Sequence, residues 1–360
     1  MDRIAVNPPR LVFKRSQEKD LLLSLHSIDR MSDVIPAREV LGAGMNSVGE
    51  IGGLKMTVWS LYQVCNVVCP GLFKTVRGLA TGDTNAELAA IAIFNQALRL
   101  RVDRLAEHRF LCNRETKTID AMVGSRYKFY KNLHFYQRVK DSLPPCRFGG
   151  ATISGRWLSM RFYHPETVAE TADGKYFPGF HMANHEGGQA SITVSNILLR
   201  FPGQLGFLSQ IRYDKVPHVG REVANKFARR MARVLDHQWD SVKLLDQIAQ
   251  AQAAKLGLGS YREILEKRRR RNICWILQKT GLTKSLAMAT LSSAIVQPCG
   301  EKTPLPLVSI GNADLRERTA YDLAVAVSRC GQGCHLHVRE LAERAAFNIL
   351  TGNVRFPIRK

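Results

Sequence analysis

The chain has 360 residues, and its 52 Lys and Arg against 31 Asp and Glu give a formal net charge of +21. Hydrophobic residues make up 45% and aromatic residues 8%, which fits a globular protein and excludes a disordered basic arm. A folded chain tolerates such self-repulsion most easily beside a polyanion, so the charge favours nucleic acid as partner. The alternative is a basic protein that its charge merely keeps soluble.

Residues 1–55 predict an irregular lead-in. Pro8, Pro9 and Pro36 interrupt regular structure there, and residues 41–53 are rich in glycine. The N-terminus shows no apolar core of a secretory signal, and no uncharged apolar stretch is long enough to span a bilayer. We therefore expect a cytoplasmic protein without a membrane partner.

Two helices are expected over residues 56–106. Thr57 is a suitable N-cap for the first, whose apolar stripe consists of Val58, Leu61, Tyr62, Cys65 and Val68. The second covers residues 85–105, where apolar side chains recur at helical spacing.

The centre of the chain, residues 107–215, predicts strands. Its apolar runs are short, some alternate with polar residues, and turn signals separate them. Two runs flank a Gly-rich turn at residues 185–189. The strands are expected at residues 109–113, 118–123, 151–163, 176–184 and 191–199.

Helical spacing returns over residues 216–350. Residues 219–254 predict one long helix, and shorter helices follow, separated by Gly and Pro. The side chains expected to face inward on the long helix are Val223, Phe227, Met231, Val234, Leu235 and Gln238. Helices, then strands, then helices indicate an α+β fold: a central antiparallel sheet with an N-terminal helical segment and a C-terminal set of helices. We expect a single domain over residues 56–350, followed by a tail at 351–360.

Several segments resemble the phage/plasmid-like "domain of unknown function 932" family. The run HRFLCNRETKTIDAMVGSRYKFYKNLHFYQRV carries the match at Ala121, Ser125, Arg126, Tyr127 and Asn132. PGFHMANHEGGQASITVSNILLRFPGQLGF carries it at Pro178, Gly179, Asn184, Glu186, Gly188, Val194, Arg200 and Gly206, although His185 stands in place of the usual Ser. WSLYQVCNVVCPGLFKTV and TAYDLAVAVSRCGQGCHLHVRELAERAAFNIL look like the family's Pro-terminated helix and closing helix pair. The resemblance implies a mobile-element protein in a bacterial host cell, and it implies no activity.

Candidate nucleic-acid contacts combine cations with aromatic side chains. Cations follow phosphates, and aromatic faces stack on unpaired bases. In the expected strand at 151–163, one alternating face is apolar and the other carries Trp157, Arg161 and Tyr163. Four cations share one face of the expected long helix, and a run of five cations follows it. The remaining candidates are Arg126, Tyr127, Lys128, Tyr130, Lys131, Lys226, Arg229, Arg230, Arg233, Lys267, Arg268, Arg269, Arg270 and Arg271.

The sequence thus predicts a protein that binds single-stranded DNA without strong sequence preference, as a homo-oligomer and without a cofactor. Annealing or recombination, by analogy with Rad52-type proteins, is one role for such binding. The alternatives are a metal-dependent nuclease that uses His185 and Glu186, and a phage structural or anti-defence protein. We favour a tight turn over a metal site at residues 184–188.

The eight cysteines are expected to be reduced. Cys330 and Cys334 lie close to His335 and His337, a set of residue types that can bind zinc. Two cysteines four residues apart on a helix also occur in ordinary cores, and the sequence leaves both interpretations open.

Overall fold

The computed structural model describes residues 11–12, 17–201, 205–219, 222–236, 239–255, 278, 282, 319–332, 334 and 336–353. These residues form an α+β fold with two sheets, which confirms the expected fold class and adds a second sheet to it. Among the described residues, no helix is both long and apolar enough to cross a membrane.

The larger sheet, sheet A, is antiparallel throughout, with the order β1-β8-β9-β11-β12-β13 and β10 paired to β11. The expected strand at residues 151–163 is split into two strands, because Gly155 has a φ of +56° and forms a tight turn with Arg156. The strands are β1 (Leu11–Val12), β8 (Arg147–Ser154), β9 (Trp157–Tyr163), β10 (Ala169–Thr171), β11 (Gly174–His185), β12 (Ile192–Phe201) and β13 (Leu205–Val216).

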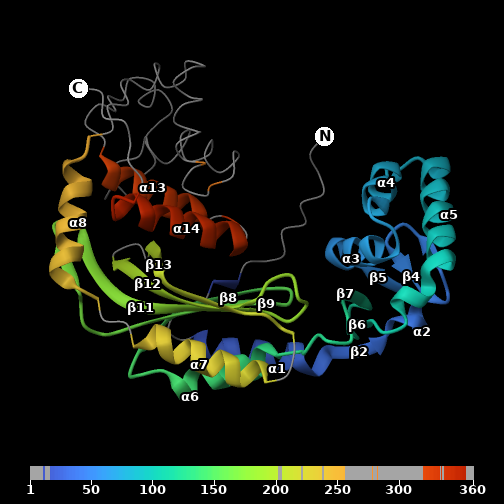
Figure 1. Ribbon diagram of the computed structural model, residues 1–360, viewed down its shortest axis with the longest axis horizontal. Helices are drawn as coiled ribbons and strands as arrows, with labels where there is room; N and C mark the ends of the chain where they lie inside the picture. The colour runs from blue at the N-terminus through green and yellow to red at the C-terminus, as the bar shows by residue number, and fades with distance from the viewer. Residues whose placement is uncertain are drawn as a thin grey trace.

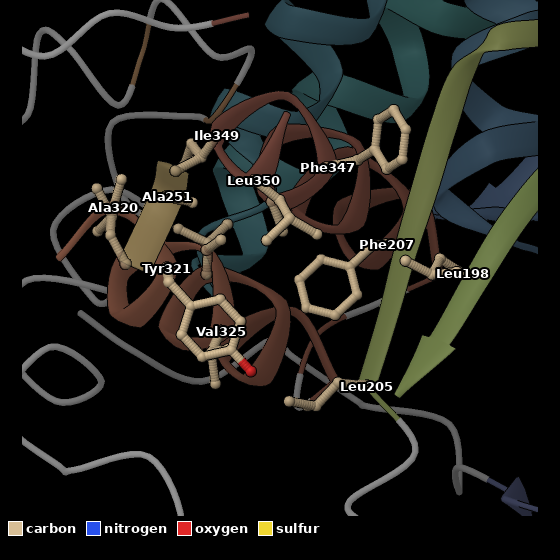
Figure 2. Close-up of a cluster of buried hydrophobic side chains, with 14 of the residues drawn as sticks. Leu198, Leu205, Phe207, Ala251, Ala320, Tyr321, Val325, Phe347, Ile349 and Leu350 are labelled. Carbon is tan, nitrogen blue, oxygen red and sulfur yellow. The ribbon is translucent and has the colours of Figure 1, made fainter. Parts of the chain in front are cut away.

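Two helical layers enclose sheet A (Figure 1). Helices α1 (Gln17–Met31), α6 (Asn132–Ser142) and α7 (Val223–Leu235) pack on one side, around Phe135, Phe162 and Phe227. On the other side lie α13 (Ala320–Gln332) and α14 (Leu336–Leu350), with α8 (Ser241–Ala253) at one end. These three helices share a core with Leu198, Leu205 and Phe207 of the sheet (Figure 2).

The expected long helix at residues 219–254 is two helices. Asp240 accepts a hydrogen bond from the amide of Lys243 at 3.0 Å and so starts α8 anew. Of the positions expected to face inward, Val223, Phe227, Met231 and Val234 are buried, Leu235 is half-buried, and Gln238 lies outside the described residues. Because of this break, the chain can leave the side of sheet A on which α7 packs and reach the end of the sheet where α8 lies (Figure 1).

The smaller sheet, sheet B, has the order β2-β6-β7-β5-β4-β3, with β5 parallel to β7 and the other pairs antiparallel. The hairpin expected from residues 109–113 and 118–123 is present as predicted. The strands are β2 (Ser32–Pro36), β3 (Met45–Ser47), β4 (Glu50–Ile51), β5 (Leu54–Met56), β6 (Arg109–Asn113) and β7 (Thr118–Val123). The helices beside them are α2 (Ala37–Leu41), α3 (Val58–Val68), α4 (Leu72–Leu79), α5 (Thr84–Arg101) and the 3₁₀ helix η1 (Val102–Leu105).

Sheet B corrects two expectations. Residues 17–56 are not an irregular lead-in, because they supply α1, α2 and four strands. The local proline and glycine signals were correct about turns but could not reveal that β2 pairs with β6, where Pro36 lies opposite Arg109. Thr57 does cap α3, accepting from the Ser60 amide at 3.1 Å. Of the expected apolar stripe of α3, Leu61, Cys65 and Val68 are buried, whereas Val58 and Tyr62 are exposed.

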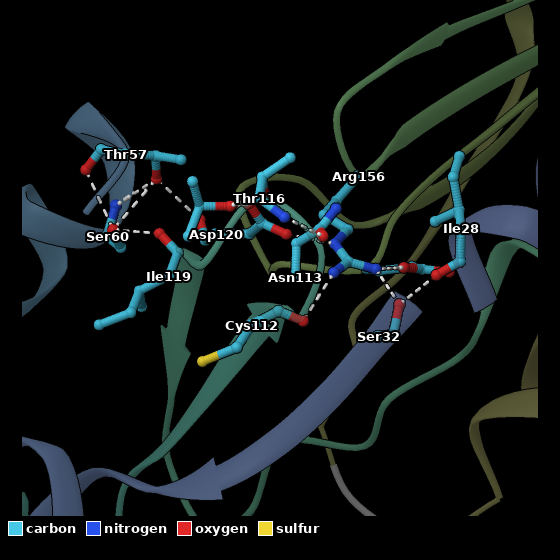
Figure 3. A network of polar contacts seen from close by, with 12 residues as sticks. Ile28, Ser32, Thr57, Ser60, Cys112, Asn113, Thr116, Ile119, Asp120 and Arg156 are labelled. Carbon is cyan, nitrogen blue, oxygen red and sulfur yellow. Dashed lines mark hydrogen bonds and ion pairs between the residues drawn. The ribbon is translucent and has the colours of Figure 1, made fainter. Parts of the chain in front are cut away.

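One buried arginine joins the two sheets (Figure 3). The guanidinium of Arg156 donates to Asp120 Oδ2 at 2.7 Å, to the Cys112 carbonyl at 3.1 Å and to the Ser32 hydroxyl, all on sheet B. It also donates to Glu186 Oε2, 3.3 Å away, at the end of β11 in sheet A. Because Arg156 is only 6% exposed, its charge depends on these partners for compensation.

We predict that Arg156→Lys destabilises the fold by about 3 kcal/mol, because an ammonium cannot reproduce the planar set of donors and leaves buried acceptors unpaired. Urea unfolding measures the change in the free energy of unfolding. Arg114→Lys is the matched control, since Arg114 pairs with Asp33 at 3.0 Å but is 65% exposed, and we expect a change below about 0.5 kcal/mol. Equal effects of the two substitutions would contradict a central role for Arg156.

Candidate nucleic-acid interface

The structure brings together two of the basic segments singled out in the sequence. The backbone amide of Lys128 donates to the His218 carbonyl at 2.8 Å, and Tyr127 forms an isolated bridge with Val219. Val219 lies four residues before the start of α7. The segment that contains Arg126 and Lys128 is therefore held beside the entry to the basic helix.

Helix α7 has a fully basic outer face. Its four cations, Lys226, Arg229, Arg230 and Arg233, are exposed, and the helix contains no acidic residue. Arg230 pairs with Asp214 at 3.1 Å, whereas the other three make no ion pair with a described residue. A cationic face without compensating acids has high potential at its surface and attracts anionic ligands.

The neighbouring segment extends this basic surface. Arg126 and Lys128 are exposed and make no ion pair within the described part of the chain, and the same holds for Arg138 on α6. Lys131 differs, because it pairs with Asp29 of α1 at 2.7 Å. We call the exposed cations without an ion-pair partner the basic strip: Arg126, Lys128, Arg138, Lys226, Arg229 and Arg233.

Tyr127 and Tyr130, expected to stack on bases, are half-buried and their rings make contacts within the protein. The Tyr127 hydroxyl donates to the Glu186 carbonyl at 2.8 Å, and its ring stacks on His218 with centroids 5.1 Å apart. Burial raises the pKa of both tyrosines. The Tyr130 ring packs on Phe227, which anchors α7. The Tyr127 contacts hold the segment that carries Arg126 and Lys128, and the Tyr130 contact holds α7 beside it.

Arg161 lies under α14 and Trp157 is buried, so neither side chain faces a ligand. Trp157 is 4% exposed, with its ring edge-on to His185. Arg161 donates to both carboxylate oxygens of Glu343, at 2.6 and 2.7 Å. The sequence could not show this cover, because α14 lies about 180 residues further along the chain. The third residue of that face, Tyr163, is half-buried at the end of β9.

A cluster of buried ionisable groups continues beneath α14. His181 on β11 lies 2.8 Å from the Ser159 hydroxyl and 3.5 Å from Glu340 Oε1. Burial holds the pKa of His181 well below its usual value, and the nearby cations Arg161, Arg344 and Arg339 lower it further. Burial raises the pKa of Glu340 to about 7, partly opposed by Arg344.

The turn expected at residues 184–188 is present. Gly188 has a φ of +72°, and a Cβ there would lie 2.9 Å from Cε2 of the Tyr127 ring. Glu186 accepts from the Asn132 amide at 2.5 Å and from Arg156, so its carboxylate holds the start of α6. Among the described residues, no cluster of three His, Cys, Asp or Glu side chains could bind a metal, at His185 and Glu186 or elsewhere.

Two further predicted sets are the run of five cations and the group of cysteines and histidines near residue 334. Lys267, Arg268, Arg269, Arg270 and Arg271 lie outside the described residues, as do His335 and the side chain of His337. Cys330 and Cys334 are half-buried and pack against the core between α8, α13 and α14.

An aromatic surface on α3 and α4 escaped the sequence analysis. The rings of Trp59 and Tyr62 stack with centroids 5.5 Å apart, and Phe73 lies edge-on to Tyr62 at 5.4 Å. The Arg77 guanidinium lies 5.9 Å from the Phe73 ring centre, and Lys74 is exposed nearby in sequence. Tyr62 is 41% exposed. The signal in the sequence was the pair Trp59 and Tyr62, which lie three residues apart on a helix without charges. We call Trp59, Tyr62, Phe73 and Arg77 together the α3–α4 aromatic patch.

These features define an α+β protein with an exposed basic strip and a separate exposed aromatic patch. Comparisons of the chain with family models, with curated proteins and with solved structures find no match.

The buried Glu340 predicts a specific pH dependence. Its pKa is about 7 in the folded protein and near 4.5 when exposed, so its favourable contribution is complete below about pH 4.5 and is lost as the pH rises through 7. Compared with Glu340→Gln, the wild type should lose up to about 3 kcal/mol of stability between pH 5 and 8. Urea unfolding of both proteins across this range measures the difference, and a constant difference would contradict the assignment.

Proposed function

We propose that this protein binds single-stranded nucleic acid, with DNA the favoured strand, without strong sequence preference. The observation that carries the proposal is the basic strip, six exposed cations on α6, α7 and the segment before α6 that make no ion pair with a described residue. Cations of this kind bind phosphates and release condensed counterions, a gain that is independent of base sequence.

The α3–α4 aromatic patch supports the preference for single strands. A paired base hides its faces within the stack, whereas an unpaired base can stack on an exposed ring such as Tyr62. Arg77 and Lys74 provide cations beside these rings, on a helix without acidic residues. Stacking contributes about 1–3 kcal/mol per base in proteins that bind single strands.

The proposal includes a biological role, which is the coating or annealing of single strands for a mobile element. The segments that resemble the phage/plasmid-like family include Tyr127, Asn132, Asn184, Glu186 and Gly188, which contact one another beside the basic strip. A mobile-element protein that coats or anneals single strands as a homo-oligomer agrees with a basic surface of low specificity.

We predict that single-strand affinity falls linearly with salt on logarithmic axes, with a slope that indicates several phosphate contacts. The triple variant Arg126→Ala, Arg229→Ala, Arg233→Ala should bind every strand more weakly and lower the slope by two to three contacts. Fluorescence anisotropy with DNA, RNA and duplex oligonucleotides measures both quantities.

The matched control removes three exposed cations elsewhere: Arg99→Ala, Arg101→Ala, Arg104→Ala on α5 and η1. It has the same net charge and should keep the wild-type slope. If both triple variants behave alike, general charge and not the basic strip accounts for binding. No binding even at low salt would falsify the proposed function.

The aromatic patch generates a separate prediction. Tyr62→Leu should weaken single-strand binding about five- to tenfold, because one stacked base loses its partner ring. Duplex binding and the salt slope should stay unchanged, since no cation is removed. Tyr62→Phe keeps the ring and should bind as the wild type does. A loss that affects single and double strands equally would contradict stacking at this patch.

A further inference from the structure

A cavity of about 670 Å³ opens at the end of sheet A where β8 begins and β9 ends. Three aromatic rings, those of Tyr163, Phe177 and Phe201, contribute to its wall. The volume lies within the range of about 300–1,000 Å³ that small-molecule sites occupy. The basic strip and the aromatic patch share no residue with this cavity.

The three rings form one cluster of mutual contacts. The Tyr163 ring lies edge-on to Phe177 with centroids 5.6 Å apart, and tilted to Phe201 at 5.5 Å. Phe177 and Phe201 meet edge-on at 5.3 Å. All three are half-buried, so each ring keeps part of its surface accessible. Such a wall favours a flat, apolar ligand that can stack or pack edge-on.

Two glycines keep this arrangement in place. A Cβ at Gly149 would lie 3.2 Å from Cδ1 of Tyr163 and 3.3 Å from Cδ1 of Leu199, so a side chain there would displace the tyrosine. Gly174 has a φ of +152°, and a Cβ there would collide with the Phe201 carbonyl. The backbone therefore approaches the rings more closely than other residues allow.

Polar groups of both kinds stand at the rim. Arg147 is exposed and makes no ion pair with a described residue, so its donors are available. Asp173 accepts from Gln252 Nε2 at 3.1 Å through one carboxylate oxygen, while the other has no partner among the described residues. Lys175 pairs with Glu170 at 3.2 Å. The rim has two cations and two anions, so it is not a simple phosphate site.

We infer that this cavity binds an unpaired nucleobase of the strand held by the protein. A base has flat faces for the three rings and an edge with both donors and acceptors, which suits Asp173 and Arg147 together. A phosphate would meet the acids at the rim, and a purely apolar ligand would leave the rim groups without partners. The inference rests on the proposed function and deepens it, because it adds a pocket for one base.

The test uses a single strand that carries 4-thiothymine, a photoreactive base, bound to the full chain and irradiated. Peptide mapping should place a cross-link at Tyr163, Phe177 or Phe201. Tyr163→Leu and Phe177→Leu should each lower the cross-link yield at the cavity and weaken binding about five- to tenfold. Tyr163→Phe keeps the ring and should cross-link as the wild type does. Thermal unfolding confirms that each variant is folded.

The outcomes separate the two proposals. Salt-dependent binding with cross-links only outside the cavity, and with wild-type affinity in Tyr163→Leu and Phe177→Leu, would overturn the base pocket and leave the proposed function standing. Calorimetric titration with deoxythymidine monophosphate probes the cavity without a strand. If no strand binds but the monophosphate binds and Phe177→Leu abolishes that binding, the cavity is a nucleotide site and the proposed function fails. If neither binds, both proposals fail.

Discussion

A buried guanidinium links the two sheets of this protein and has partners on both. Arg156 sits in the two-residue turn between β8 and β9 and donates to groups on β2, β6 and β7 of sheet B as well as to Glu186 of sheet A. A guanidinium stays charged at every physiological pH and has its donors fixed in one plane, so its partners must adopt one geometry. Removing such a charge from water is costly, and only the full set of contacts compensates for it.

The same contacts position the candidate interface. Glu186 joins Arg156 to the amide of Asn132, and Asn132 in turn accepts from Asn184 at 2.8 Å. This chain of hydrogen bonds fixes the start of α6 and, through Tyr127, the segment beside α7. These buried polar groups thus fix the position of the exposed cations. The buried groups themselves do not contact the proposed ligand. A rigid support of this kind reduces the entropy lost when a strand binds.

Local signals predicted what neighbouring residues determine. The β6–β7 hairpin, the Thr57 cap and the buried side of α7 were all readable because each depends on a few residues. The covering of Arg161 was not, since it depends on Glu343, 182 residues beyond Arg161. Alternation showed correctly that these residues share a face but could not show what packs on it. The α3–α4 aromatic patch was missed for a related reason, because a helical aromatic pair suits a core as well as a surface.

Two glutamates of α14, Glu340 and Glu343, limit how the sequences of related proteins can vary. Glu340 and Glu343 are three residues apart and meet His181 and Arg161, two residues that pair across neighbouring strands. A slide of α14 by one turn would bring Phe347 to the place of Glu343 and leave Arg161 without its carboxylate. Apolar helix faces tolerate small slides, but this face does not. We therefore expect homologous chains to change these two pairs together, so that this buried polar layer shows paired substitutions even where the surrounding apolar residues vary independently.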